Sequence, residues 1–246
     1  MRVHVVGASG TFPTASDPGS GYVIENDETR VWCDAGPGTF VRLPFDPDLI
    51  DFVVISHRHP DHCTDVFTAY HPLTFRPEPR TGIPLFASED VLDHLAAFTG
   101  KGRDEMFGET FDIQPVGDAD SVEIGSLKVR FVEMNHSAHD LGSEWDGDGR
   151  TLFFTGDTGP GDWESKVGAV DVMLSEAALQ GTRGESDDIL HLYAREAGAI
   201  ARASGAKRLV LTHIPPYMDK SISVAEAEET FGRAVQLAVS GTSFDV

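Results

Sequence analysis

Short apolar and alternating runs recur along the chain and predict a protein rich in β-strands. The first run, 2–7, alternates valine with other residues, and 21–25 and 29–34 follow it, joined by a hairpin turn at 26–28. The apolar run 52–56 is typical of a buried strand. The same criteria predict further strands at 84–87, 111–116, 121–124, 128–135, 151–155, 172–175, 208–212 and 235–239.

Helix signals are fewer and gather in the second half. Ser88-Glu89-Asp90 is a good helix start and precedes a predicted helix over 91–99. Two more helices are predicted at 191–204 and 224–233, a polar loop at 100–110, and a turn at 146–149. No long linker rich in proline or glycine divides the chain. We therefore expect one α/β domain, 1–246, with helices outside paired sheets.

Composition places the chain among globular proteins. It has 246 residues, of which 40% are hydrophobic and 24% charged, enough to build a core. Its two cysteines, Cys33 and Cys63, cannot form a disulfide framework. The first residues resemble a strand rather than a signal peptide, and no apolar run approaches the ~18 residues of a membrane span. We expect a cytoplasmic protein without a membrane segment.

The charge balance restricts the partners. Nineteen Lys and Arg against forty Asp and Glu give a net charge of −21, which opposes the approach of long nucleic acids. A small anionic substrate is not excluded, because a bound metal can dominate the local field. Solubility or a saline habitat explains the acidity equally well.

A dense group of ligand-type residues follows the predicted buried strand. His57, His59, Asp61 and His62 lie within six residues, in a chain of ten histidines. Imidazole suits zinc, iron and manganese, and a carboxylate compensates the metal's charge. The spacing indicates a metal site at the end of the strand.

This His-x-His-x-Asp-His sequence resembles the signature of the metallo-β-lactamase superfamily. The later elements of that signature follow in order: His136 after the run 128–135, Asp157 within Thr155-Gly156-Asp157-Thr158, and His213 after the run 208–212. The resemblance covers essentially the whole chain. It implies a four-layer αβ/βα sandwich, with an active site at one edge of the two sheets.

The resemblance also implies a ligand set for two divalent metal ions. One ion would be held by His57, His59 and His136, the other by Asp61, His62 and His213, and Asp157 would bridge them. Zinc fits these nitrogen and oxygen donors best, with manganese or iron as alternatives. A hydroxide bound between the metals would be the nucleophile. We expect Asp34 to support the site by hydrogen bonding, and Cys63 to pack inward rather than bind metal.

A second pair of residues points to one branch of the superfamily. Glu176 in Ser175-Glu176-Ala177-Ala178 and His191 in His191-Leu192-Tyr193-Ala194 resemble elements of the RNase Z-like phosphodiesterases. On that resemblance His191 delivers a proton to the leaving oxygen or stabilises the phosphoryl group, Glu176 orients it, and Asp61 relays the proton. The alternative to a catalytic role is a structural one, in which Glu176 ends a strand and His191 begins a helix.

Two further features narrow the substrate. The opening Gly7-Ala8-Ser9-Gly10-Thr11 and the segment 211–217 resemble small bacterial phosphodiesterases of this fold, some of which hydrolyse cyclic nucleotides. The interval between His136 and Asp157 carries an acidic loop with Glu144, Asp146 and Asp148, and no basic stripe stands out. The acidic interval and the absence of a basic stripe argue against tRNA processing.

We therefore predict a dinuclear metal-dependent hydrolase that cleaves a small phosphodiester such as a cyclic nucleotide. The alternatives are a hydrolase of carboxylic esters, lactones or thioesters, an RNase Z-like ribonuclease, and a metal-loaded binding module without turnover. The family resemblance implies a homodimer. Phe75, Trp145 and Tyr217 could stack on a base or pack in the core, and His139 is interpreted as an exposed strand residue or a pocket residue.

Overall fold

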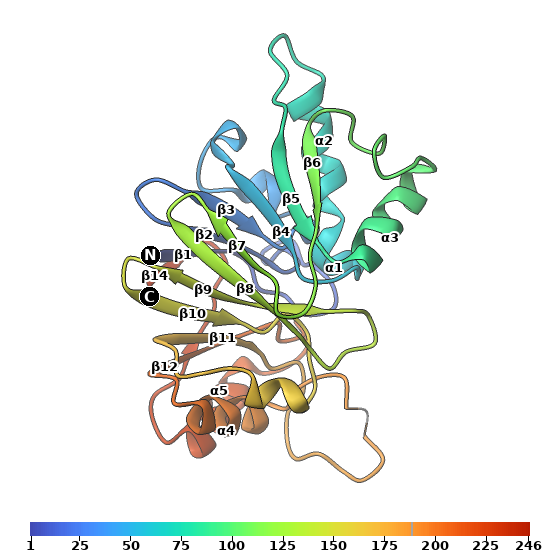
Figure 1. Cartoon of the computed structure of the whole chain (residues 1–246). Coiled ribbons are helices and arrows are strands. Elements are labelled where there is room, and N and C mark those ends of the chain that lie inside the picture. The colour runs from blue at the N-terminus through green and yellow to red at the C-terminus, as the bar shows by residue number, and fades with distance from the viewer. Residues whose placement is uncertain (188) are drawn as a thin grey trace.

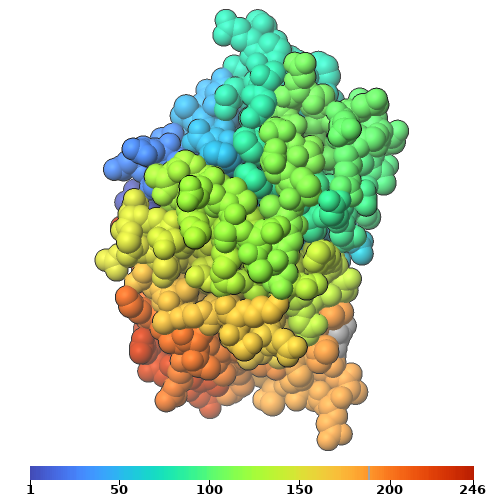
Figure 2. All heavy atoms as spheres, in the orientation of Figure 1, coloured from blue at the N-terminus to red at the C-terminus, as the bar shows by residue number. Residues whose placement is uncertain are grey.

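Two β-sheets stacked face to face form the centre of the molecule, and helices cover their outer faces (Figure 1). The computed structural model describes residues 1–187 and 189–246. Within these ranges each sheet has seven strands. The predicted four-layer αβ/βα sandwich is confirmed. Figure 2 shows the N-terminal part of the chain in the upper half of the molecule and the C-terminal part in the lower half.

The two sheets have related strand orders. The first runs β14 (Ser243–Asp245), β1 (Arg2–Gly7), β2 (Gly21–Glu25), β3 (Arg30–Cys33), β4 (Phe52–Ile55), β5 (Ile83–Ala87) and β6 (Phe111–Pro115). The second runs β13 (Gln236–Leu237), β12 (Arg208–Thr212), β11 (Val172–Glu176), β10 (Arg150–Phe154), β9 (Leu141–Gly147), β8 (Leu127–Glu133) and β7 (Ser121–Ile124). Strands β3 to β6 are parallel, as are β10 to β13.

The helices divide between the two outer faces. Beside the first sheet lie α1 (Pro60–Cys63), α2 (Asp65–Thr74) and α3 (Glu89–Thr99), and beside the second lie α4 (Ala194–Ser204) and α5 (Lys220–Phe231). Short 3₁₀ turns occur at Phe40–Arg42, Pro47–Leu49 and Asp162–Ser165. No helix in the described part of the chain is long and apolar enough to cross a bilayer.

Side-chain alternation along the strands builds three apolar layers. In β4, Val54 faces the layer between the sheets, while Val53 and Ile55 face the helices α2 and α3. Tyr22 and Phe154 meet in the central layer, with ring centroids 5.1 Å apart. Because both faces of the strands are buried, the sheets are rigid supports for the loops that leave them.

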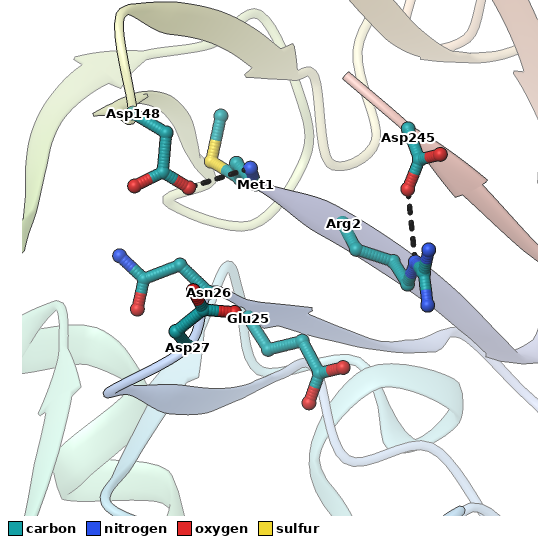
Figure 3. A pocket seen from close by; sticks show the side chains of 7 residues that line it. All are labelled: Met1, Arg2, Glu25, Asn26, Asp27, Asp148 and Asp245. Atoms are coloured by element: carbon teal, nitrogen blue, oxygen red, sulfur yellow. Dashed lines mark hydrogen bonds and ion pairs between the residues drawn. The ribbon is translucent and has the colours of Figure 1, made fainter.

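The carboxyl ends of the parallel strands meet at one edge of the sandwich. The turns after β4, β10 and β12 all emerge there and carry six of the seven predicted ligand residues, and His136 comes from the segment after β8. The chain termini mark the opposite edge, where β1 begins (Figure 3). A hollow of about 230 Å³ lies at that edge, and among its lining residues the Met1 amine pairs with Asp148 and Arg2 pairs with Asp245.

Several predicted boundaries were wrong. The helix predicted at 191–204 begins at Ala194, because Tyr193 is extended and its N–H donates to Glu196, which caps the first turn. The helix predicted at 224–233 begins at Lys220 after the cap Asp219 and ends where Gly232 turns left-handed. The last predicted strand shrinks to Gln236–Leu237.

Candidate metal centre

The turn after β4 brings four ligand-type side chains to one point. His59 is extended and immediately precedes α1, and Pro60 occupies the first helical position, so the helix starts abruptly. Asp61 and His62 therefore turn back toward His57. Backbone bonds fix this turn from the neighbouring loop: Ala35 N–H donates to the His62 carbonyl at 2.6 Å.

The second sheet supplies the remaining three. His136 follows β8, Asp157 follows β10, and His213 follows β12 with a left-handed φ of 54°. Three groups of donor atoms result, each within 4.8 Å. The first two are His57, His59, His136 and Asp157, and Asp61, His62 and His213, and the third joins Asp157, His191 and His213. All seven residues predicted from the sequence thus come together.

The spacing of the nitrogens fits metal coordination. His59 Nδ1 lies 3.0 Å from His57 Nε2 and 3.1 Å from His136 Nε2. His62 Nε2 lies 3.2 Å from His213 Nε2. Zinc–nitrogen bonds of about 2.0–2.1 Å in a tetrahedron give edges of about 3.3 Å, close to these separations. Asp157 Oδ1 is buried without a hydrogen-bond partner, as expected of an atom that faces a cation.

The electrostatics of the cluster also favour a cation. Burial and the nearby His62 lower the pKa of His57, so the ring stays in the neutral form that binds metal. Burial opposes charge on His62, yet Asp157, Asp61 and Asp34 outweigh it and raise the pKa of His62. The carboxylates therefore stabilise positive charge at this point. The cluster is able to bind metal ions.

Two hydrogen bonds and one close ion pair, between His57 and Asp140, orient the imidazoles from the side away from the cluster. His62 Nδ1 lies 2.7 Å from Asp34 Oδ2, His57 Nδ1 lies 2.7 Å from Asp140 Oδ2, and His136 Nδ1 lies 2.8 Å from the Leu190 carbonyl. Such partners fix which ring nitrogen faces the metal and raise its basicity. Sequence reasoning included Asp34 but missed Asp140, which no pattern distinguishes from an ordinary loop aspartate.

Glu176 and His191 also reach the cluster. Glu176, at the end of β11, is fully buried, and its Oε1 lies 2.9 Å from His191 Nδ1. The same carboxylate accepts from the N–H groups of Thr158, Ala178 and Leu192, which holds it rigidly. Burial works against a charged ring, but the bond to Glu176 raises the pKa of His191 to about 9. The His191 ring stacks 6.0 Å from that of His213 and remains one-third exposed.

Comparison with known proteins decides the family. The model of a "Beta-lactamase superfamily domain" matches residues 29–214, which include all of these residues. The chain belongs to the beta-lactamase superfamily. It is 31% identical over 258 residues to the uncharacterised protein Rv1339 of Mycobacterium tuberculosis, covering 100% of this chain and 92% of that one.

Two further likenesses agree with the superfamily assignment. The crystal structure of the metallo-beta-lactamase fold protein YhfI from Bacillus subtilis superposes with a TM-score of 0.88 at 22% identity, over 99% of both chains. A ribonuclease Z of Kineococcus radiotolerans is 24% identical over 91% of this chain and 86% of its own. With its superfamily fold and its His/Asp cluster, the protein is a metal-dependent hydrolase.

Of the other residues singled out from the sequence, Cys63 and Trp145 are buried, whereas His139, Phe75 and Tyr217 are exposed. Cys63 is buried, and burial raises the pKa of its thiol to about 12, as expected of a packing residue. Trp145 lies in the central layer and cannot reach a substrate. His139 is exposed, but it lies in the loop before β9 and not on a strand. Phe75 is exposed where α2 ends, and Tyr217 is exposed after His213.

The prediction of an acidic loop between His136 and Asp157 was wrong. Most of that interval is the hairpin of β9 and β10, closed by Asp148 and Gly149, both with positive φ. Glu144 lies within β9 and pairs with Arg130 at 2.5 Å, and Asp148 binds the N-terminal amine at the far edge (Figure 3). These residues therefore place no negative charge beside the superfamily's metal-binding edge.

Proposed function

We propose that the protein is a phosphodiesterase that hydrolyses small phosphodiesters, with cyclic nucleotides as the best candidates. The observation that carries this proposal is the hydrogen-bonded pair Glu176–His191 beside the metal cluster. Hydrolysis of an ester or a lactone needs the metal centre. A positioned imidazole that donates a proton to the leaving group matters most when that group is an alkoxide, which leaves poorly without a proton. The likeness to a ribonuclease Z supports phosphodiester chemistry of this kind.

The cluster is suited to phosphoryl chemistry. Two divalent ions held there would supply a nucleophile from water at neutral pH and stabilise the charge on the phosphoryl oxygens. One would be bound by His57, His59 and His136 and the other by Asp61, His62 and His213, with Asp157 between them. Zinc fits the donor set, and manganese or iron fits it as well.

His191 is the proposed proton donor. Glu176 engages Nδ1 and so fixes the ring, which leaves Nε2 for the substrate. A proton on Nε2 can pass to the leaving oxygen as the phosphorus–oxygen bond breaks. We also propose that Asp61 relays a proton at the same centre, which its Oδ2, 3.2 Å from His213 Nε2, supports.

RNA is the second candidate substrate, because a ribonuclease Z is among the relatives. The net charge of −21 opposes the binding of a long polyanion, and this effect is strongest at low salt. A small diester experiences little of this long-range repulsion. We therefore rank small diesters above RNA as the proposed substrates.

The proposal is tested with protein loaded with zinc, manganese or iron. The substrates are bis-p-nitrophenyl phosphate, 2′,3′- and 3′,5′-cyclic AMP, a lactone and an unprocessed tRNA. The control pair is His59→Ala, which removes a ligand, and His94→Ala, which changes an exposed histidine on α3. We expect cyclic nucleotide turnover that His59→Ala abolishes and His94→Ala retains. Lactone turnover above that of every diester would overturn the proposal in favour of an ester hydrolase, and preferential tRNA cleavage in favour of a ribonuclease.

A further inference from the structure

Two exposed aromatic rings lie together beside the metal cluster. Phe12 is 44% exposed and Tyr217 is 73% exposed, although both are large apolar side chains. Their ring centroids are 6.4 Å apart and their planes lie within 22° of parallel. They come from opposite ends of the chain, so the fold and not the local sequence pairs them.

Both rings are tied to the residues of the cluster. Phe12 follows Thr11, whose backbone N–H lies 3.5 Å from His213 Nε2. Tyr217 is four residues beyond His213, after the rigid pair Pro215-Pro216. The loop before Phe12 is bonded to the segment after His213, since Gly10 N–H donates to the Ile214 carbonyl at 3.3 Å.

The loop that carries Phe12 is held in one conformation. Thr11 has a left-handed φ of 68°, an unfavourable state for a β-branched residue. Ser9 Oγ donates to the Phe12 carbonyl at 2.7 Å, which closes the turn. A Cβ on Gly10 would lie only 2.3 Å from the His213 carbonyl oxygen, so this close approach requires glycine. The position of Phe12 is therefore coupled to that of His213.

We propose that Phe12 and Tyr217 form an aromatic platform on which the base of a nucleotide substrate stacks. This inference rests on the proposed phosphodiesterase function. A base is joined to its phosphate only through the ribose, so a phosphate at the cluster places the base within reach of neighbouring loops. Stacking on aromatic rings tolerates every base, because each base has a π-face. The platform therefore selects nucleotides over base-free phosphodiesters rather than one base over another.

The kinetic test compares two substrates that differ only in the base. They are adenosine 3′,5′-cyclic phosphate and methyl riboside 3′,5′-cyclic phosphate, with product formation followed by phosphorus NMR. The quantity measured is the ratio of their kcat/KM values. In Phe12→Ala and Tyr217→Ala this ratio should fall about ten- to a hundredfold, the range that stacking on an aromatic side chain provides. Tyr217→Phe keeps the ring and should keep the ratio.

A matched control is available on the first sheet's helical face. Phe98 on α3 is 75% exposed, and Phe98→Ala removes an equally exposed ring away from the cluster. It should leave the ratio at the wild-type value. A ratio unaffected by Phe12→Ala and Tyr217→Ala would overturn the platform. The platform would also be overturned if Tyr217→Ala left the ratio unchanged but converted a dimer into a monomer in analytical ultracentrifugation. In that case the rings would contact a second copy of the chain and not a base.

A binding measurement separates failure of the platform from failure of the proposed function. Calorimetry with metal-loaded protein compares adenosine 5′-monophosphate with ribose 5-phosphate. Tighter binding of the nucleotide, lost in Tyr217→Ala, supports the platform even where no diester is hydrolysed. Equal binding of both compounds by the wild type overturns the platform even if cyclic nucleotides are hydrolysed.

Discussion

Asp34 Oδ2 lies 2.7 Å from Nδ1 of His62, a residue 28 positions further along the chain. The same carboxylate accepts from the Ser56 N–H at 2.8 Å and from the Ser56 hydroxyl at 3.0 Å. Asp34 has a left-handed φ of 59°, which turns the chain sharply where β3 ends. One buried carboxylate thus fixes both the strand end and the orientation of the His62 ring, a proposed metal ligand.

Asp34→Asn should weaken metal binding without unfolding the protein. The amide is neutral and no longer raises the basicity of His62, so we expect about a 10- to 100-fold loss of affinity. Competition with a coloured chelator measures it. Asp112→Asn, an exposed change on β6, is the matched control and should leave affinity unchanged. Wild-type affinity in Asp34→Asn would show that His62 needs no such partner.

His191→Ala should separate metal binding from proton transfer. It removes the proposed donor and leaves all seven proposed metal-binding residues in place. Turnover of diesters with poor leaving groups should fall about 10²- to 10⁴-fold, because general acid catalysis is lost. Bis-p-nitrophenyl phosphate, whose leaving group needs no proton, should be hydrolysed with a much smaller loss. Equal losses on both substrates would contradict the assignment.

Gly36→Ala should displace the turn that carries Asp61. A Cβ at this position would lie 2.1 Å from the Asp61 carbonyl oxygen and 2.7 Å from the Ser20 nitrogen, both backbone atoms. Overpacking of this kind costs about 1–3 kcal/mol of unfolding free energy. Urea denaturation measures it. Gly168→Ala, where a Cβ meets nothing within 4 Å, should be close to neutral. Equal stability of the two variants would refute the clash.

Asp171 should make stability depend on pH below about 4. The Lys207 ammonium and the Thr151 N–H lower the pKa of Asp171 to about 2. A pKa depressed in the folded state stabilises the protein above the ordinary carboxyl pKa of 3.8, and this contribution is lost as pH falls toward 2. Lys207 is 71% exposed, so solvent screening limits the contribution to about 1 kcal/mol.

The measurement compares the wild type with Asp171→Asn in urea at pH 6, 4 and 3. The wild type should be more stable at pH 6, and the difference should shrink at pH 3. Lys207→Met removes the ammonium but keeps the hydrogen bond from the Thr151 N–H to the Asp171 carboxylate. At pH 6 it should therefore lose less stability than Asp171→Asn does. A gap between wild type and Asp171→Asn that is constant over this range would rule out the predicted titration.

The four cluster residues that lie close together in the chain could be predicted directly from the sequence. His57, His59, Asp61 and His62 are close in sequence, so their spacing alone indicated a ligand group. His136, Asp157 and His213 are isolated residues, and only the family resemblance selected them. Asp140 stayed hidden because its partner His57 lies across the fold on another sheet, and burial of one aspartate leaves no mark in a hydrophobicity pattern.

Element boundaries failed where tertiary contacts override local preference. β9 contains Gly142, Glu144 and Asp146 and lacks an apolar run, yet β8 and β10 pair with it on both sides. His191 was assigned to a helix, but 191–193 are not helical, and Leu192 N–H donates to Glu176 instead of to a helical carbonyl. The carboxylate that orients His191 is therefore part of what displaces the helix start.

The proposed ligands come from both sheets, with four after β4 and three after strands of the second sheet. During synthesis the first four emerge early, whereas His213 emerges only after β12 has been made. Neither of the two donor groups proposed to hold the metal ions is complete until the two sheets have docked. Metal uptake therefore measures whether the two sheets have docked as well as whether the ligand residues are present. A chain cut short before residue 213 would lack a donor however well its first sheet folds.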